Sequence, residues 1–199
     1  MTVTAKHIIR RWYERYEDEV ESTNANDTSG VVDELIFDQF IYLWISFNGS
    51  YESIFYQDRH HVSDSNGRSP AELTLVLNAV QFCYRNNPDF HSAVRVLLIS
   101  PEVKFFSEQN SSDDYAGFRV LDVYGSISSL NHSAKEGLRN SDNSDLDRIR
   151  AMAALLYRVR CNLFHGKKGP KSQKDVEIIR NSIKPLSVIT AAAMEMVYD

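Results

Sequence analysis

Apolar residues recur every three or four positions along most of the chain, which is the spacing of helices with one buried face. Between residues 31 and 54 they are dense enough to predict a mostly buried helix. Three further stripes have helical spacing, and a last helix is expected from about Gln173 to Met196. The residues of the three stripes are Leu73, Leu77, Val80 and Tyr84; Val120, Val123, Tyr124, Ile127 and Leu130; and Met152, Leu156, Val159 and Leu163.

Several short motifs mark where helices begin. Ser69-Pro70-Ala71-Glu72 combines a serine cap, a proline at the first helical position and a glutamate three residues after the cap. Asn87-Pro88 and Ser100-Pro101 predict two short helices. Ser144, followed by acids in the next turn, predicts another start.

Polar segments rich in Gly, Ser, Asn, Asp or Lys separate these helices and are interpreted as loops. They cover residues 21–30, 58–69, 108–114, 139–144 and 166–172. The best candidate for a strand is residues 93–100, but it lies within a helical context. The sequence therefore predicts an all-α fold, an antiparallel helical bundle of about five to seven helices in a single domain spanning residues 1–199.

Composition narrows the class of protein. Hydrophobic residues make up 43% and charged residues 25% of the chain, as in globular proteins. No run of about 18 apolar residues exists, so we expect no membrane span, and the charged N-terminus lacks the apolar stretch of a secretory signal. Cys83 and Cys161 form no metal-binding spacing. Two lone thiols suit a reducing compartment, so we expect a cytoplasmic protein.

Charge is distributed unevenly. The net charge is −5, yet residues 148–184 hold ten basic and only two acidic residues. Such asymmetry can create a local positive field that attracts phosphates. A solvated basic helix face accounts for the same pattern, and charge alone leaves both interpretations open.

One segment within this basic stretch carries residues suited to chemistry. Gly166 is placed to end the helix that runs through Leu163, so His165 would lie at a helix C-terminus. The carbonyl groups there favour a protonated imidazole, whereas neighbouring cations oppose it. A histidine titrating near neutral pH suits general acid–base catalysis. Arg160 offers a planar fork for phosphate oxygens, and RNA supplies its own 2′-hydroxyl nucleophile, so no metal is needed in principle.

The spacing of these residues sets a geometric condition. Five residues correspond to about 140° on a continuous helix, so Arg160 and His165 would not share a face, whereas Arg158 and His165 would. Either the helix unwinds before His165, or a second subunit supplies the partner groups. Alternatively, His165 simply caps the helix and one of the two arginines pairs with an acid on a neighbouring helix.

Two segments resemble a known family. Arg160-Cys161-Asn162-Leu163-Phe164-His165-Gly166 resembles the RxxxxH signature of HEPN domains, and VRCNLFHGKK around it resembles the ApeA-like HEPN branch. About 120 residues upstream, FIYLWISFN and Tyr51 resemble the FxxLWxxFNxxY helix of that branch. The resemblance covers residues 31–199. Residues 1–30 are then interpreted as an N-terminal helix and loop added to a HEPN-like core.

The resemblance implies a homodimer in which two copies of the motif share one cleft. It also implies a metal-independent endoribonuclease without a cofactor, acting on RNA as a toxin or in stress response or phage defence. Arg160 would stabilise the scissile phosphate and His165 would be the acid or base. Arg158, Lys167 and Lys168 would contact phosphate. A cognate regulator is left open.

The chain departs from the family pattern at Cys161, where a polar residue commonly follows the motif arginine. Asn162 is expected to substitute as a hydrogen-bonding partner and is counted with Arg160 and His165 in the catalytic set. The alternative is a non-catalytic RNA- or nucleotide-binding module, or a dimeric interaction module, with a degenerate motif. His60 and His61, adjacent in a polar loop, are interpreted as solvated rather than as metal ligands.

Overall fold

The computed structural model describes residues 3–25, 29–57, 71–108, 128–164 and 172–198. Within these residues the chain forms eight helices and no strand, which confirms the all-α fold and exceeds the expected number of helices by one. The helices are α1 (Val3–Ala25), α2 (Ser29–Gln57), α3 (Glu72–Asn86), α4 (Pro88–Leu98), α5 (Pro101–Glu108), α7 (Ser128–Arg139), α8 (Asp145–Phe164) and α9 (Gln173–Tyr198).

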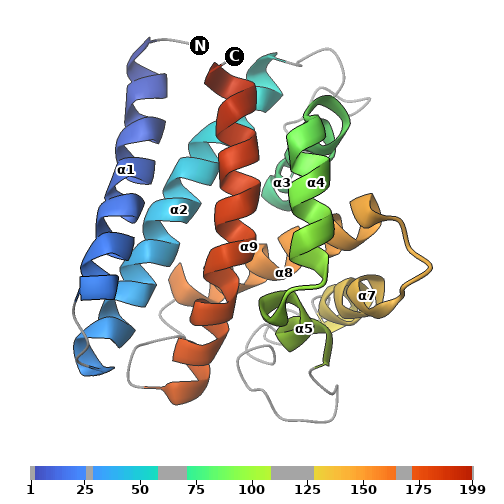
Figure 1. The fold of residues 1–199 in the computed structure, drawn as a ribbon. Helices are drawn as coiled ribbons and strands as arrows, with labels where there is room; N and C mark the ends of the chain where they lie inside the picture. The colour runs from blue at the N-terminus through green and yellow to red at the C-terminus, as the bar shows by residue number, and fades with distance from the viewer. Residues whose placement is uncertain (1–2, 26–28, 58–70, 109–127, 165–171, 199) are drawn as a thin grey trace.

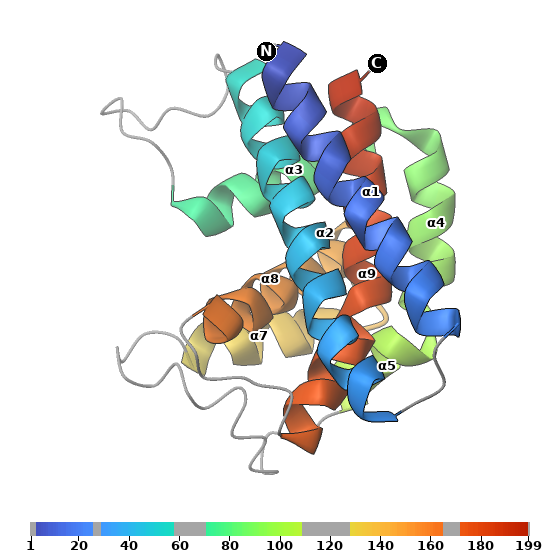
Figure 2. The same cartoon turned by 90° about the vertical axis from the view of Figure 1, so that its left-hand side faces the viewer.

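The long helices α1, α2 and α9 run alongside one another, and α8 crosses them (Figures 1 and 2). α2 packs against both α1 and α9, while α8 packs against α7 and α3. The start of α1 and the end of α9 lie at the same end of the molecule (Figure 1), where the Tyr198 hydroxyl donates a hydrogen bond to the Lys6 carbonyl. α2 therefore lies between α1 and α9 and is the central one of the three long helices that lie side by side.

This central position explains the dense apolar pattern of α2. A helix enclosed by neighbours buries more than one face, so its apolar residues are not confined to one stripe. Trp44 and the phenylalanines on either side of it belong to the core, as the sequence pattern predicted. The buried apolar residues of α2 are Ile36, Phe37, Phe40, Leu43, Trp44, Phe47, Tyr51 and Ile54. In α8 the predicted stripe is also buried at Met152, Leu156 and Val159.

Three of the predicted helix starts are confirmed. The Asn87 side chain caps α4 by accepting a hydrogen bond from the Phe90 amide at 3.0 Å. The Ser144 hydroxyl caps α8 by accepting from the Asp147 amide at 3.2 Å. α5 begins at Pro101, as expected. Residues 93–98, considered as a strand, belong to α4.

The predicted start of α3 is wrong by two residues. α3 begins at Glu72, and Ala71, which makes no side-chain capping hydrogen bond, is its N-cap. Ser69 and Pro70 lie outside the described residues. The backbone of Ala71 is not helical (φ −58°, ψ 144°), and the Glu72 carboxylate faces α2 and α8, where it accepts three hydrogen bonds instead of capping the helix.

α1 is integrated into the bundle through its contact with α2. Ile9 of α1 is 3% exposed and belongs to the core. The Ser46 hydroxyl of α2 donates a hydrogen bond to the Ile9 carbonyl at 3.1 Å. A Cβ atom added to Gly49 would lie only 2.6 Å from Ile9 Cγ1. The absence of a side chain at residue 49 therefore permits the close approach of the two helices.

Some sequence predictions fall outside the described residues. These are the His60–His61 loop and most of the apolar stripe between residues 120 and 130; α7 begins at Ser128. None of the described helices combines the length and apolar content that a membrane crossing requires.

The close approach of α1 and α2 predicts that Gly49→Ala destabilises the parent protein but stabilises a variant in which Ile9 is shortened to alanine. Gly49→Ala should lower the free energy of unfolding, because overpacking costs about 1–3 kcal/mol and outweighs the ~1 kcal/mol that alanine gains in helix propensity. In an Ile9→Ala background the obstructing Cγ1 is gone, so the same substitution should be stabilising. Urea denaturation of the four proteins measures the cycle; equal losses in both backgrounds would contradict this packing.

Candidate functional site

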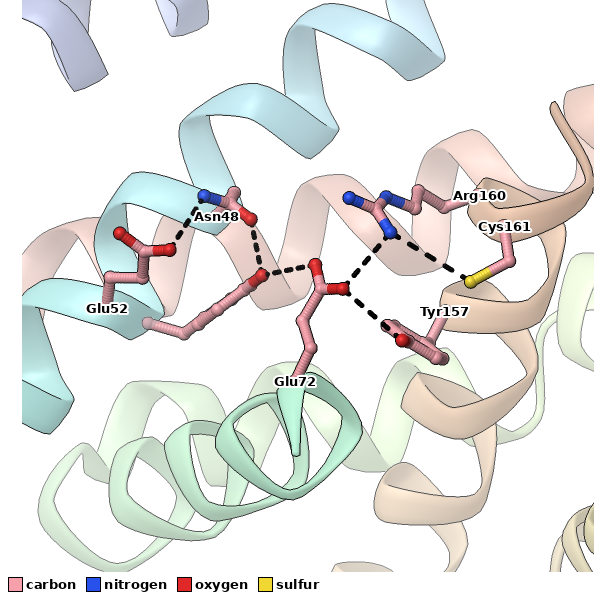
Figure 3. Close-up of polar contacts among 7 residues, drawn as sticks. Asn48, Glu52, Glu72, Tyr157, Arg160 and Cys161 are labelled. Atoms are coloured by element: carbon pink, nitrogen blue, oxygen red, sulfur yellow. Dashed lines mark hydrogen bonds and ion pairs between the residues drawn. The ribbon is translucent and has the colours of Figure 1, made fainter. Parts of the chain in front are cut away.

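The motif arginine lies four residues before the end of α8 and reaches across to α3. Arg160 Nη1 donates to Glu72 Oε2 at 3.1 Å, which forms an ion pair between the two helices (Figure 3). The side chains of Arg160 and Glu72 are 25% and 32% exposed. The pair is thus partly screened from water but open to solvent on one side. This confirms the expectation that one of the two arginines pairs with an acid on a neighbouring helix.

The Glu72 carboxylate is shared among three donors. Tyr51 of α2 donates a hydrogen bond from its hydroxyl to Glu72 Oε1 at 2.9 Å. Tyr157 of α8 donates to Oε2 at 3.3 Å (Figure 3). The Tyr51 hydroxyl is also in hydrogen-bonding contact with Asn48 Oδ1. Hydrogen bonds to a charged group are stronger than those between neutral groups. One carboxylate from α3 therefore joins α2 to α8.

Aromatic rings surround the Arg160 guanidinium. Its central carbon lies 5.7 Å from the ring centroid of Trp44, 6.0 Å from that of Tyr157 and 5.2 Å from that of Phe164. Cations are attracted to ring faces at such distances. Trp44 is 1% exposed and Phe164 is 53% exposed, so the guanidinium contacts both the core and the surface.

Burial and the shared carboxylate shift the proton equilibria of this cluster. The pKa of Tyr51 is raised by burial and by its hydrogen bond to Glu72. The pKa of Tyr157 is raised by burial, by Cys161 and by Glu72. Burial by itself lowers the pKa of Arg160, but Cys161 and Glu72 outweigh it and raise that pKa above its ordinary value. Both phenols therefore remain protonated donors, and the arginine remains a cation.

The cluster unites the two sequence segments that resemble the HEPN family. Trp44, Asn48 and Tyr51 come from the upstream segment, and Arg160 comes from the downstream one. Trp44 contacts Arg160 directly, whereas Tyr51 reaches it through Glu72. Residues about 120 positions apart in the chain thus form a single site.

The other predicted site residues are placed differently. Arg158 is 8% exposed and Asn162 is 1% exposed, so both belong to the buried side of α8. Burial disfavours their expected direct roles, a phosphate contact for Arg158 and a catalytic hydrogen bond for Asn162, because neither side chain offers a surface to a bound ligand. Cys161 is 9% exposed, with its Sγ 3.9 Å from Arg160 Nη1. His165, Lys167 and Lys168 lie outside the described residues.

Sequence reasoning missed Glu72 as a site residue, although a signal was present. Glu72 precedes Val76, Ala79 and Cys83 by four, seven and eleven residues, so it shares their helix face. All three of these residues are buried. An acid in line with a buried face needs a partner, because an unpaired buried charge is costly. The interpretation of Glu72 as part of a helix cap hid this signal.

The arrangement suits the binding of an anion. Arg160 stays a cation and its side chain is 25% exposed, so an anion can approach it from the solvent side, although its Nε is buried and the neighbouring Glu72 carboxylate offsets part of its charge. Among the described residues no group of three or more His, Cys, Asp or Glu side chains is arranged to hold a metal ion.

No protein-family model, curated protein or solved structure matches this chain. The geometry and the motif are therefore the basis for assigning a function.

The raised pKa of Tyr51 predicts a contribution to alkaline instability. Above pH ~10, the ordinary pKa of tyrosine, the unfolded chain releases a proton that the folded protein retains. Stability linked to Tyr51 is therefore fully present below that pH and is lost as the pH rises further. Tyr51→Phe should make the fall in unfolding free energy between about pH 9.5 and 11 shallower, by up to ~1.4 kcal/mol per pH unit. Denaturation at a series of pH values tests this, and equal slopes would contradict it.

Proposed function

We propose that this chain is a metal-independent endoribonuclease of the HEPN type, in which Arg160 binds the scissile phosphate and His165 transfers protons. One observation carries the proposal. The motif arginine is held by the Glu72 carboxylate and by three aromatic rings at the end of α8, and α8 ends at Phe164, immediately before His165. These contacts place the cation of the motif close in the chain to the histidine that we expect to transfer protons.

The chemistry needs only groups that RNA and this segment supply. The 2′-hydroxyl of one nucleotide attacks the adjacent phosphorus and loses its proton to a base. The new 2′-O–P bond forms as the P–O5′ bond breaks, and the departing O5′ takes a proton from an acid. His165 serves as base or acid. Arg160 stabilises the charge that develops on the non-bridging phosphate oxygens.

A second copy of the chain would complete this site. On a continuous helix the Arg160 and His165 side chains point about 140° apart. Pairing of two chains, as the resemblance implies, allows Arg160 of one copy and His165 of the other to face one phosphate. Lys167 and Lys168 would add phosphate contacts beside them.

Cleavage of RNA in the presence of EDTA is the first test. The purified parent should cleave a mixed RNA substrate, and His165→Ala should lower the rate by about 10²–10⁴, the usual contribution of a general acid or base. Arg160→Ala should also abolish most of the cleavage. Arg95→Ala is the matched control, because Arg95 is an exposed arginine on α4 paired with Asp145 at 3.6 Å; this variant should cleave like the parent.

The alternative function, a non-catalytic RNA- or nucleotide-binding module, gives a different result in the same experiment. Its affinity for RNA would fall steeply with salt, because binding would release counterions from phosphates. No product would form with the parent, and His165→Ala would bind nearly as well. That outcome would overturn the nuclease proposal.

The oligomeric state provides a separate test of the shared site. Sedimentation velocity of the purified parent at micromolar concentration should give a dimer. Mixing Arg160→Ala with His165→Ala should then restore part of the activity, because a mixed dimer has one site with both functional residues. A monomer that retains full cleavage would contradict a site shared between two copies.

A further inference from the structure

We propose that Glu72 is a positioning residue of the RNA-cleaving site, where it holds the Arg160 guanidinium in the orientation that meets the phosphate. The inference rests on the proposed function and assigns a role to a residue outside both family-like segments. Its basis is the contact of Arg160 Nη1 with Glu72 Oε2 at 3.1 Å, together with the two phenols that share the same carboxylate.

The carboxylate is fixed independently of the arginine. Tyr51, which is 1% exposed, donates to Oε1 from α2, and Tyr157 donates to Oε2 from α8. The backbone of Glu72 lies in the first turn of α3. The carboxylate is therefore held from three helices, and Arg160 meets it at Oε2 (Figure 3).

Fixing the guanidinium matters because arginine is long and flexible. Holding such a side chain in one rotamer costs conformational entropy. When the folded protein already holds the guanidinium in place, this entropy is not lost again as Arg160 engages the phosphate in the transition state. The Glu72 contact sets the rotation of the guanidinium plane, and the rings of Trp44, Tyr157 and Phe164 restrict its translation.

Two other roles for Glu72 make different predictions. As a competitor that occupies the guanidinium until phosphate displaces it, Glu72 would weaken substrate binding, and its removal would lower KM. As a general acid or base, it would contribute one limb of the pH profile. The two phenols favour the positioning role over competition, because they hold the carboxylate in place, so that Arg160 stays in contact with it while a phosphate binds.

Glu72→Gln is the substitution that tests these roles. It keeps the shape of the side chain and an oxygen that accepts from a tyrosine, but it removes the charge that holds Arg160. We expect kcat and kcat/KM to fall together by about 10- to 100-fold, the effect of a small misplacement of a reacting group. KM and the shape of the pH profile should stay unchanged. In an Arg160→Ala background the substitution should have little further effect.

Glu102→Gln is the matched control. Glu102 also lies in the first turn of a helix, and it accepts from Lys184 Nζ at 3.1 Å with a side chain 25% exposed. This variant loses a similar ion pair away from Arg160, and its kcat should equal that of the parent. A melting temperature for each variant separates loss of activity from loss of folding. If Glu72→Gln does not fold, Tyr51→Phe replaces it and should lower kcat to a smaller extent at unchanged KM.

The outcomes distinguish this inference from the proposed function. A parent that does not cleave RNA overturns both. A parent that cleaves, with a folded Glu72→Gln variant of undiminished kcat, overturns the positioning role alone. The same holds if Glu72→Gln lowers KM, if it removes a limb of the pH profile, or if Glu102→Gln loses as much activity.

Discussion

The carboxylate of Glu72 accepts hydrogen bonds from Tyr51, Tyr157 and Arg160, and the rest of the site depends on this convergence. A partly buried charge is tolerated only where donors compensate for the lost water. Here the donors come from two different helices, so the requirement also sets how α2, α3 and α8 meet. The polar cluster of Glu72 and its three donors therefore links three helices of the bundle and also forms the candidate site.

The candidate site is continuous with the hydrophobic core. Trp44 is almost completely buried among the apolar residues of α2, yet its ring also lies against the Arg160 guanidinium. Tyr51 likewise packs its ring against Phe47, with centroids 5.2 Å apart, while its hydroxyl reaches Glu72. Close packing of the core thus restricts the polar groups to small displacements. The orientation of the arginine is consequently a property of the whole bundle rather than of one flexible side chain.

The differences between expectation and structure have a common cause. Glu72 has the position of a capping glutamate three residues after a serine, but its carboxylate contacts α2 and α8 and α3 begins at Glu72 itself. Arg158 and Asn162 lie near the motif arginine in the chain, but the rotation of α8 buries both. In each case a local pattern had more than one solution, and packing between helices selected one of them.

The sequence by itself determined the all-α fold, the burial of α2 and the starts of α4, α5 and α8, because apolar periodicity and capping act within one or two helical turns. It also singled out Arg160 as the residue of interest. Only the tertiary structure decided that Glu72, whose carboxylate accepts from two tyrosines, would hold that arginine. The contact between these side chains depends on how three helices pack. The spacing of residues within one helix does not predict which side chains will face one another across such a contact.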